Sequence, residues 1–329
     1  MKMTNKQARV PALLLALLLI LTVPAQALFS KKSEESVAPA QGAPIAKELS
    51  IKTYRNIPYR AQFLAADDEG GELKFSVATA PKKGVVAVSG NTFTYTPAEG
   101  KSGKDSFTYV AEDEGGNVSA PATVTVTVQK TKSGVAYQDT EGSDAAAAAQ
   151  YLAETGVFTG ACLGGNYYFE PDRTVSRSEF LAMTMELANL PADAVTMTGF
   201  SDDEAIPTWA KSYAAAGLAD GIVQGVSTEA GAAFCSADPI TFNEAASILD
   251  RVLSVGDVDL ATWYADRDAV PSWAAQAVGN MEAVSVMAAG SFGSNTLAQP
   301  MTRADAAQML CSAGTLLEGE KTGFFDWMK

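Results

Sequence analysis

The apolar positions along the chain follow two different periods, and the change lies near residue 133. Between residues 45 and 129, short runs such as 73–77 and 124–128 alternate apolar and polar side chains. This period of two is typical of strands that bury one face. Turn residues separate the runs, and Gly90 between two of them indicates a hairpin. The pattern predicts an all-β sandwich over residues 45–129.

Residues 135–318 show helical spacing and contain three internal repeats. Each repeat opens with an aromatic residue, any residue and an aspartate, and the three aspartates are Asp139, Asp202 and Asp266. These landmarks lie 63 and then 64 residues apart. An Ala-rich helix, a Gly-containing turn, a loop and a second helix are expected to follow in each repeat. A steady period of this length indicates helical units that bury their apolar faces against one another.

The bounds of the helices follow from the apolar spacing and from capping boxes. First helices are predicted over 145–155, 208–218 and 272–283, and second helices over 179–188, 244–255 and 305–316. In a capping box, a Ser or Thr hydroxyl accepts from the N–H three residues on, and the acid there accepts from the N–H of the cap. Three such pairs precede the second helices: Ser176 and Glu179, Thr241 and Glu244, and Thr302 and Asp305.

The first 27 residues are predicted to be a secretory signal peptide. Such leaders typically have a positively charged N-terminal region, an apolar run and small residues before the cleavage point. Here these are the basic residues at 2, 6 and 9, the run over 12–23, and Ala25 and Ala27. We therefore expect an exported, multidomain protein. Its predicted parts are a linker over 28–44, the sandwich over 45–129, a linker over 130–134, repeats over 135–190, 191–258 and 259–318, and a tail over 319–329.

The charge and the apolar runs exclude several kinds of partner. The net charge is −14, and removal of the leader with its three basic residues would lower it to −17. Such an acidic surface argues against nucleic acid as a partner, because phosphates require stripes of Lys and Arg. No second apolar run approaches the length of a membrane span, so no membrane partner is expected after cleavage. The acidity permits cation binding.

Several common catalytic motifs are missing from this sequence. There is no His, which removes His-based triads and most zinc sites. No Gly-x-Ser-x-Gly motif and no phosphate-binding loop occur, so we expect a non-catalytic protein without a cofactor other than calcium. The Cys residues at 162, 235 and 311 form no Cys-x-x-Cys pair. A Cys162–Cys235 disulfide and three free thiols remain alternative interpretations.

The sequence of the β segment resembles those of bacterial cadherin-like and immunoglobulin-like surface domains. The resemblance rests on Ala66-Asp67-Asp68, Tyr95-Thr96-Pro97 and the Gly-Lys-Asp-Ser-Phe-Thr-Tyr stretch over 103–109. It implies a spacer or an adhesive module that meets another surface protein, and some members bind calcium. Candidate oxygen ligands are Asp67, Asp68, Asp105 and Asp113. The alternative interpretation is turn chemistry, because Asp is common in turns.

The helical repeats resemble the S-layer homology domain. The resemblance rests on Phe-x-Asp, Trp-Ala, Gly-Ile-x-x-Gly, Phe-x-Pro and Thr-Arg-Ala-Glu patterns, which recur in varied form in the three repeats. It implies an all-α domain in which three units form one pseudo-threefold body. It also implies location at the cell wall or S-layer, through non-covalent binding of a peptidoglycan-associated secondary polysaccharide that is often pyruvylated.

The resemblance also implies which residues bind the polysaccharide. Arg177 and Arg303 match the arginine that follows the cap, whereas repeat two has Phe242 at that position. An Arg in the first helical turn opposes the helix dipole, which independently indicates an anion nearby, and its planar guanidinium suits a carboxylate. The alternative interpretation is two exposed helix-start positions without a ligand. Trp209 and Trp273 are candidate platforms for sugar rings, and core packing is the alternative.

The sequence therefore predicts a cell-wall protein that is anchored by its helical repeats and presents the β domain. Four departures from the repeat pattern accompany this prediction. Besides Phe242, repeat one has Asp144 where the other repeats have Trp, and repeat three lacks the Gly-Ile-x-x-Gly turn over 285–289. The Phe-x-Pro motif is intact only in repeat one, at 169–171. The alternative hypothesis is an adhesin or calcium-binding surface module in which the repeats are mainly structural.

Overall fold

The computed structural model describes residues 42–321 except 69, 265–268 and 289. The predicted signal peptide, nearly all of the linker over 28–44, the landmark Asp266 and most of the tail lie outside these residues. In the described part, no helix is both long and apolar enough to cross a membrane.

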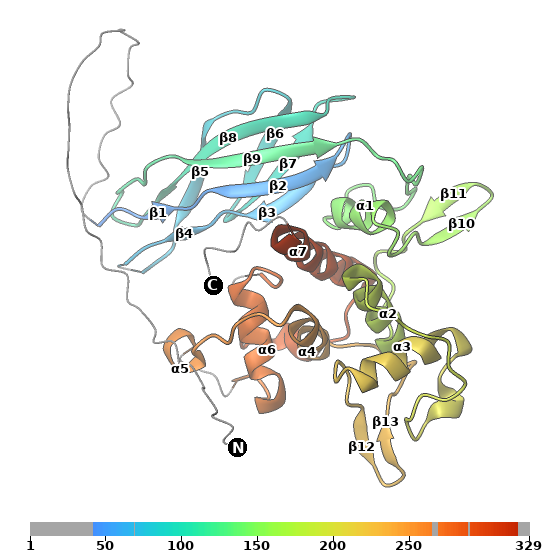
Figure 1. Cartoon of the computed structure of the whole chain (residues 1–329). Helices are drawn as coiled ribbons and strands as arrows, with labels where there is room; N and C mark the ends of the chain where they lie inside the picture. Colours follow the sequence, from blue (N-terminus) through green and yellow to red (C-terminus); the bar gives the residue numbers. More distant parts are fainter. Residues whose placement is uncertain (1–41, 69, 265–268, 289, 322–329) are drawn as a thin grey trace, which may run out of the picture. The chain divides into compact units, whose positions relative to one another are not determined.

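The predicted sandwich is confirmed. A four-stranded sheet has the order β2(Leu49–Tyr54), β9(Ala122–Gln129), β8(Gly103–Glu112), β5(Lys74–Thr79), and a three-stranded sheet has the order β3(Tyr59–Gln62), β7(Thr92–Pro97), β6(Gly84–Ser89). A short pair joins β1(Ile45–Ala46) to β4(Ala65–Ala66). All pairings are antiparallel except the one between β2 and β9. Figure 1 shows the two sheets.

The alternating residues of the strands form the core of the sandwich. Phe107 and Val124 face each other in the register of β8 and β9 and are almost fully buried. Phe63 packs against Phe93 and Tyr109 with ring centroids 4.8 and 4.5 Å apart. Burying rings and branched side chains in this way supplies most of the stability of such a domain.

The helices lie close to the ranges that the sequence predicted. They are α1(Ala146–Glu154), α2(Arg177–Ala188), α3(Thr208–Ala219), α4(Phe242–Leu253), α5(Leu260–Trp263), α6(Ser272–Ala283) and α7(Arg303–Lys321). Helix α7 continues into the segment predicted to be a tail. Two hairpins, β10(Ala161–Leu163)–β11(Asn166–Tyr168) and β12(Val226–Thr228)–β13(Gly231–Ala233), and the 3-10 turns Asp203–Ala205 and Asn295–Ala298 occupy the loops. The prediction of an all-α repeat region was therefore wrong in these loops.

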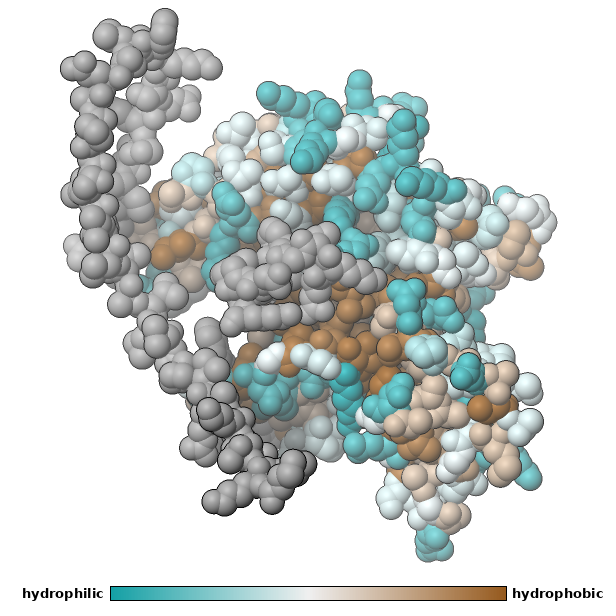
Figure 2. All heavy atoms as spheres, viewed as in Figure 1, coloured by the Kyte–Doolittle hydropathy of each residue, from teal (hydrophilic) through white to brown (hydrophobic). Residues whose placement is uncertain are grey.

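The helices pair between repeats rather than within them. Helix α2 of repeat one packs on α3 of repeat two, α4 of repeat two on α6 of repeat three, and α7 of repeat three on α1 of repeat one. Figure 1 shows these pairs. Because the last helix returns to the first, the three repeats form a closed ring. On the face drawn in Figure 2, brown apolar residues gather where the helices meet.

A cycle of backbone hydrogen bonds lies at the centre of this ring. The N–H of Val175 donates to the carbonyl of Met301 (3.1 Å), that of Ile240 to Val175 (2.9 Å), and that of Met301 to Ile240 (2.8 Å). All three residues are buried. Each residue stands immediately before a capping Ser or Thr, so the three second helices begin around one point.

The capping boxes hold the second helices at their first turns. The Ser176 hydroxyl accepts from the N–H of Glu179, and the Glu179 carboxylate accepts from the N–H of Ser176. Helix α4 has the same arrangement, and Asp305 accepts from the N–H of Thr302 at 2.9 Å in α7. These contacts satisfy N–H groups that a helix start leaves without partners.

The three cysteines carry free thiols, so the alternative of a Cys162–Cys235 disulfide was wrong. Cys162 is exposed on the hairpin of repeat one. Burial raises the pKa of the Cys311 thiol to about 12, which makes it unreactive at neutral pH.

Candidate binding site at the seams between repeats

We call a seam the place where the start of one second helix meets the loop of the next repeat. In the loop of repeat one, the N–H groups of Phe169 and Glu170 donate to the Asp139 carboxylate at 2.8 and 2.7 Å. In repeat two, Asp202 accepts from Phe234 (2.7 Å) and from the following residue (2.8 Å). In repeats one and two, the repeat aspartate is therefore a clamp that fixes the loop.

Arg177 connects repeat one to the loop of repeat two. It is the first residue of α2 and is 8% exposed. Its Nε donates to the carbonyl of Phe234 at 2.9 Å, and its Nη1 donates to Glu244 at 2.6 Å. The guanidinium carbon lies 5.7 Å from the centroid of the Phe234 ring. The side chain is thus held by a carbonyl, a carboxylate and an aromatic ring of the same protein.

Arg303 makes the same kind of connection between repeats three and one. It is the first residue of α7 and is 4% exposed. Its Nη1 donates to the carbonyl of Phe169 and, at 3.0 Å, to the Glu170 carboxylate. Its guanidinium carbon lies 4.9 Å from the centroid of Phe158. The anion that the sequence predicted beside each arginine is present as the protein's own glutamate.

The third seam differs, because Phe242 stands first in α4, at the position that an arginine occupies in α2 and α7. Phe242 is half-buried and packs against the apolar core. The next residue, Asn243, is 4% exposed, and its Oδ1 has no hydrogen-bond partner in the part of the chain that the structure describes. Repeats two and three are joined instead by apolar contacts, by the central backbone cycle, and by the Asn280 amide of α6, which donates to Asp250 (2.9 Å) and Asp257 (3.0 Å).

The two candidate tryptophans are exposed. Trp209 and Trp273 are the second residues of α3 and α6 and are 51% and 59% exposed. The alternative that they pack in the core was therefore wrong. Large exposed rings at equivalent positions of two repeats are available for stacking on a flat apolar partner.

The structure does not bring Trp209 next to Arg177. Tyr213 of α3 donates to Glu186 near the end of α2, and Gly217, one turn later in α3, lies beside Leu181, which is earlier in α2, so the two helices run antiparallel. Trp209 lies one turn before Tyr213, beyond the end of α2. Arg177 begins α2, nine residues before Glu186, which corresponds to about 13 Å along the helix. Trp209 and Arg177 therefore belong to separate places in the helical region.

The four aspartates proposed for calcium do not converge. Asp105 lies near the start of β8 and Asp113 directly after its end, and eight residues of strand span about 26 Å. Asp113 accepts from the N–H and the side-chain amide of Asn117. Among the described residues, no group of three or more acidic or Cys side chains is arranged to hold a metal ion.

Asp105 instead has a structural role in the sandwich. Its carboxylate accepts from the N–H groups of Lys82 (2.9 Å) and Lys83 (2.8 Å) and from the Tyr95 hydroxyl (2.9 Å). Burial disfavours its charge, but these hydrogen bonds outweigh burial and lower the pKa of Asp105. It joins the start of β6 to β7 and β8.

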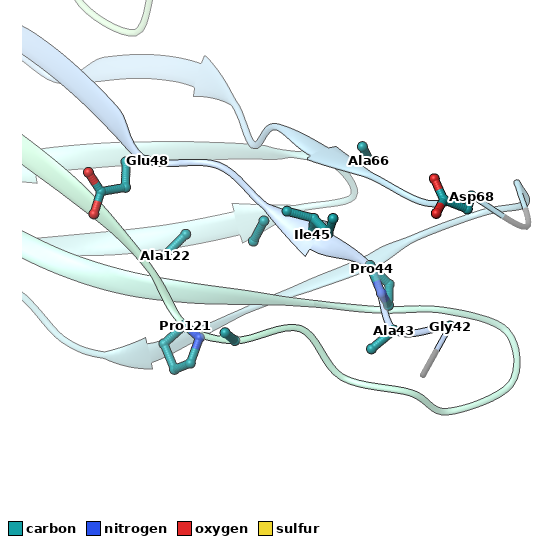
Figure 3. A pocket seen from close by; sticks show the side chains of 11 residues that line it. Gly42, Ala43, Pro44, Ile45, Glu48, Ala66, Asp68, Pro121 and Ala122 are labelled. Atoms are coloured by element: carbon teal, nitrogen blue, oxygen red, sulfur yellow. The ribbon is translucent and has the colours of Figure 1, made fainter. Parts of the chain in front are cut away.

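A pocket of about 500 Å³ lies at the end of the sandwich where β1 and β4 meet. Figure 3 shows the carboxylates of Glu48 and Asp68 at its two ends, with Ile45 between them. Small residues and two prolines, Pro44 and Pro121, form the rest of the wall. Asp68, one of the candidate calcium ligands, lines this pocket, whose wall is mainly apolar.

Sequence reasoning missed two parts of the seams. It identified Asp139 and Asp202 as landmarks without assigning them a contact, although their fixed spacing was a usable signal. It assigned no role to Glu170, which lies in the Phe-x-Pro motif of repeat one. Its positive φ of 55° and its contact with Arg303, 133 residues away, are not visible in a single sequence.

Comparison with known proteins identifies the β domain. A family model described as a bacterial Ig domain matches residues 41–128. No curated protein matches the chain. The endo-fucoidan hydrolase MfFcnA9 from glycoside hydrolase family 107 is 22% identical over 28% of this chain and 17% of that chain, with a TM-score of 0.23.

Two further solved structures align with part of the chain. The fibronectin(III)-like modules of Clostridium thermocellum CbhA are 19% identical over 27% of this chain and 48% of theirs, with a TM-score of 0.21. The SrpA adhesin from Streptococcus sanguinis is 16% identical over 30% of this chain and 63% of that chain, with a TM-score of 0.21. The chain thus spans less than two thirds of each of these structures, and such low TM-scores carry no functional argument. Residues 41–128 match the bacterial Ig model, and with the two sheets of the sandwich they form an immunoglobulin-like domain.

Proposed function

We propose that this protein is an exported, non-catalytic surface protein whose helical repeats hold it to the cell wall. The repeats bind an anionic secondary wall polysaccharide and present the immunoglobulin-like domain as a spacer or adhesive module. The single observation that carries the proposal is the closed ring of three repeats around Val175, Ile240 and Met301. A ring of this kind agrees with the pseudo-threefold body implied by the resemblance to S-layer homology domains.

The exposed tryptophans supply the surface that this function needs. Sugar rings have apolar faces that stack on aromatic side chains, and Trp209 and Trp273 expose more than half of their surface. Because the two residues occupy equivalent positions in repeats two and three, a polymer with repeating units can engage both. Two linked contacts then bind more tightly than either contact alone.

A second candidate function is adhesion through the immunoglobulin-like domain. The match of residues 41–128 to a bacterial Ig family favours it, together with the exposed valines of β6, an edge strand of the smaller sheet. Val85 is 66% exposed. In this case the helical repeats would be structural, and the chain would bind a surface partner equally well without its tryptophans.

The tryptophans provide the test. We expect the Trp209→Ala, Trp273→Ala double variant to bind native cell walls at least about threefold more weakly in a cosedimentation assay, because two stacking contacts are lost. The matched control is the Leu163→Ala, Val226→Ala double variant, which removes equally exposed apolar side chains from the hairpins. Equal loss in both variants, or no loss in either, would contradict the assignment.

A further inference from the structure

Strand β6 forms one edge of the smaller sheet, and it differs from the other edges of the two sheets. Its residues Gly84–Ser89 include no charged residue, no proline and no bulge in the register with β7. The opposite edge of the same sheet, β3, carries Arg60. In the larger sheet, the edges β2 and β5 carry Lys52 and Lys74, and the register of β5 is irregular. Charges and bulges keep an edge from pairing with another chain, so β6 is the edge that lacks this protection.

The backbone groups on the outer side of β6 have no partner in the described part of the chain. The N–H of Ala98 donates to the carbonyl of Lys83 at 2.8 Å, so the hydrogen-bonded pairs with β7 fall at the odd-numbered residues of β6. The N–H and C=O groups of the even-numbered Gly84, Val86 and Val88 therefore point away from β7, where no other described strand pairs with β6. Such a row of free groups is a template for an added strand.

The side chains of β6 are apolar and yet largely exposed. Val85 is 66% exposed and Val88 is 39% exposed, and Ala87 between them is also exposed. Removing branched apolar side chains from water is favourable, so a strand that covers this edge gains stability if it is apolar as well. The strand best suited to cover β6 is therefore one that resembles β6 itself.

We propose that β6 pairs with β6 of a second copy of this chain, antiparallel and centred on Val86. In this register, Val86 lies opposite Val86 of the other copy, and Gly84 lies opposite Val88. Each of these residues presents its N–H and C=O to the outer side, so the free backbone groups of both copies satisfy one another. The two smaller sheets then join into one continuous sheet.

The side chains of β6 are complementary to themselves in this register. On one face, Val85 lies opposite Ala87 of the other copy, and on the other face Val88 lies opposite Gly84. A branched side chain thus meets a small one in every pair except the central pair of Val86 residues. Shifting the register by two residues would set Val85 opposite Val85 in one direction, and in the other it would leave Gly84 opposite the turn after β6. The register centred on Val86 uses the most pairs with the least crowding.

Charge favours the antiparallel arrangement over a parallel one. Lys82 and Lys83 stand directly before β6, whereas the uncharged residues 89–91 end it. Antiparallel pairing places the lysines of each copy beside the uncharged end of the other. The lysines of the two copies are then separated by about 20 Å of strand, which exceeds the screening length of about 8 Å at physiological salt. Parallel pairing would set the like charges side by side, which is destabilising.

The test traps the register with disulfides, because an interface of one strand from each copy is small and the pairing is expected to be weak. It uses the mature full-length chain with Cys162→Ser, which removes the exposed native thiol. Opposite residues of a pair without hydrogen bonds have Cα atoms about 4.5 Å apart, a distance that a disulfide spans. We therefore expect the Val85→Cys and Ala87→Cys variants, mixed in equal amounts and oxidised, to become linked to each other. Mass spectrometry of the linked peptides identifies this product.

Each variant alone is the matched control. Two copies of one variant bring their thiols only to diagonal positions, with Cα atoms about 7–8 Å apart, so each should form at least about fivefold less disulfide dimer than the mixture. A second pair of variants, added to the mixture, tests the backbone hydrogen bonds. Val88→Pro removes an outward N–H and leaves the bonds to β7, whereas Val88→Ala removes the same side chain and keeps the N–H. We expect loss of the cross-link with Val88→Pro and its retention with Val88→Ala, while circular dichroism confirms that both fold.

Several outcomes would overturn the inference. Equal dimer in the single variants and in the mixture would show that the register is wrong, and no dimer in any sample would show that a second copy does not cover β6. Undiminished cross-linking of a folded Val88→Pro variant would rule out backbone pairing. If Val88→Pro does not fold, the comparison of the mixture with the single variants decides alone. The assay uses free protein in solution, so this inference goes beyond the proposed function and its outcome is independent of wall binding.

Discussion

At the scale of single residues, an aspartate of one repeat and an arginine of the preceding repeat in the ring hold the same loop. Asp139 holds the N–H groups of the loop of repeat one, and Arg303 of repeat three holds its carbonyl. Asp202 and Arg177 do the same for repeat two. An arginine that only contacted a ligand would be dispensable for folding, but these arginines also connect repeats.

Arg303→Ala is therefore expected to destabilise the protein. The substitution leaves a buried carbonyl without its donor, and such a loss costs about 1–3 kcal/mol. Denaturant unfolding measures the change, with Arg173→Ala as control. Arg173 is half-exposed and paired with Glu179, so its loss should cost less than about 1 kcal/mol. Equal stability of Arg303→Ala and wild type would show that Arg303 has no structural role.

A second residue-scale prediction concerns pH. Hydrogen bonds hold the pKa of Asp105 below its ordinary value of 3.8 in the folded state. Its contribution to stability is therefore present above that value and is lost as the pH falls through the lower folded pKa. We expect the free energy of unfolding of the sandwich to fall below about pH 4, and Asp105→Asn to weaken this dependence. An unchanged pH profile in Asp105→Asn would contradict this account.

At the scale of elements, local signals predicted the helices well and the loops poorly. Capping residues and apolar spacing placed the second helices within two residues of their observed starts. The hairpins were missed because strands of three residues are too short to show a period of two. The burial of Arg177 and Arg303 was missed because their partners lie 57 and 134 residues away, beyond any local pattern.

Helices α1 and α7 pack together and close the ring. Gly314 of α7 sets how closely the two helices approach. A Cβ at this position would lie 2.9 Å from Cδ1 of Leu187 and would overlap the hydroxyl of Tyr151. We expect Gly314→Ala to lower the melting temperature, because overpacking costs about 1–3 kcal/mol and exceeds the gain in helix propensity. Gly256→Ala is the control, since its Cβ would meet open space. A stabilised Gly314→Ala would show that the helices can separate without cost.

At the scale of the whole molecule, the change of apolar period near residue 133 coincides with the change from strands to helices along the chain. The linker over residues 130–134 is exposed, but hydrogen bonds to helix α1 hold it. The N–H groups of Lys132 and Ser133 donate to the Glu154 carboxylate at 2.7 and 3.1 Å. The closing of three repeats into one ring was inferred only through the family resemblance, because it depends on contacts between distant segments.

Limited proteolysis tests this organisation. We expect trypsin to cut first after Lys130 or Lys132 and to leave two protected fragments. Glu154→Gln should speed this cut, because a neutral amide holds the linker N–H groups less strongly than a carboxylate. A first cut elsewhere, or an equal rate in the variant, would mean that Glu154 does not control access to the linker.

Binding of the mature chain to cell walls tests the central claim most directly. The purified protein is sedimented with native walls and with walls from which the secondary polysaccharide has been extracted. The account predicts binding to native walls, loss of binding after extraction, and competition by the extracted polysaccharide. Equal binding to both wall preparations, or binding to neither, would contradict it.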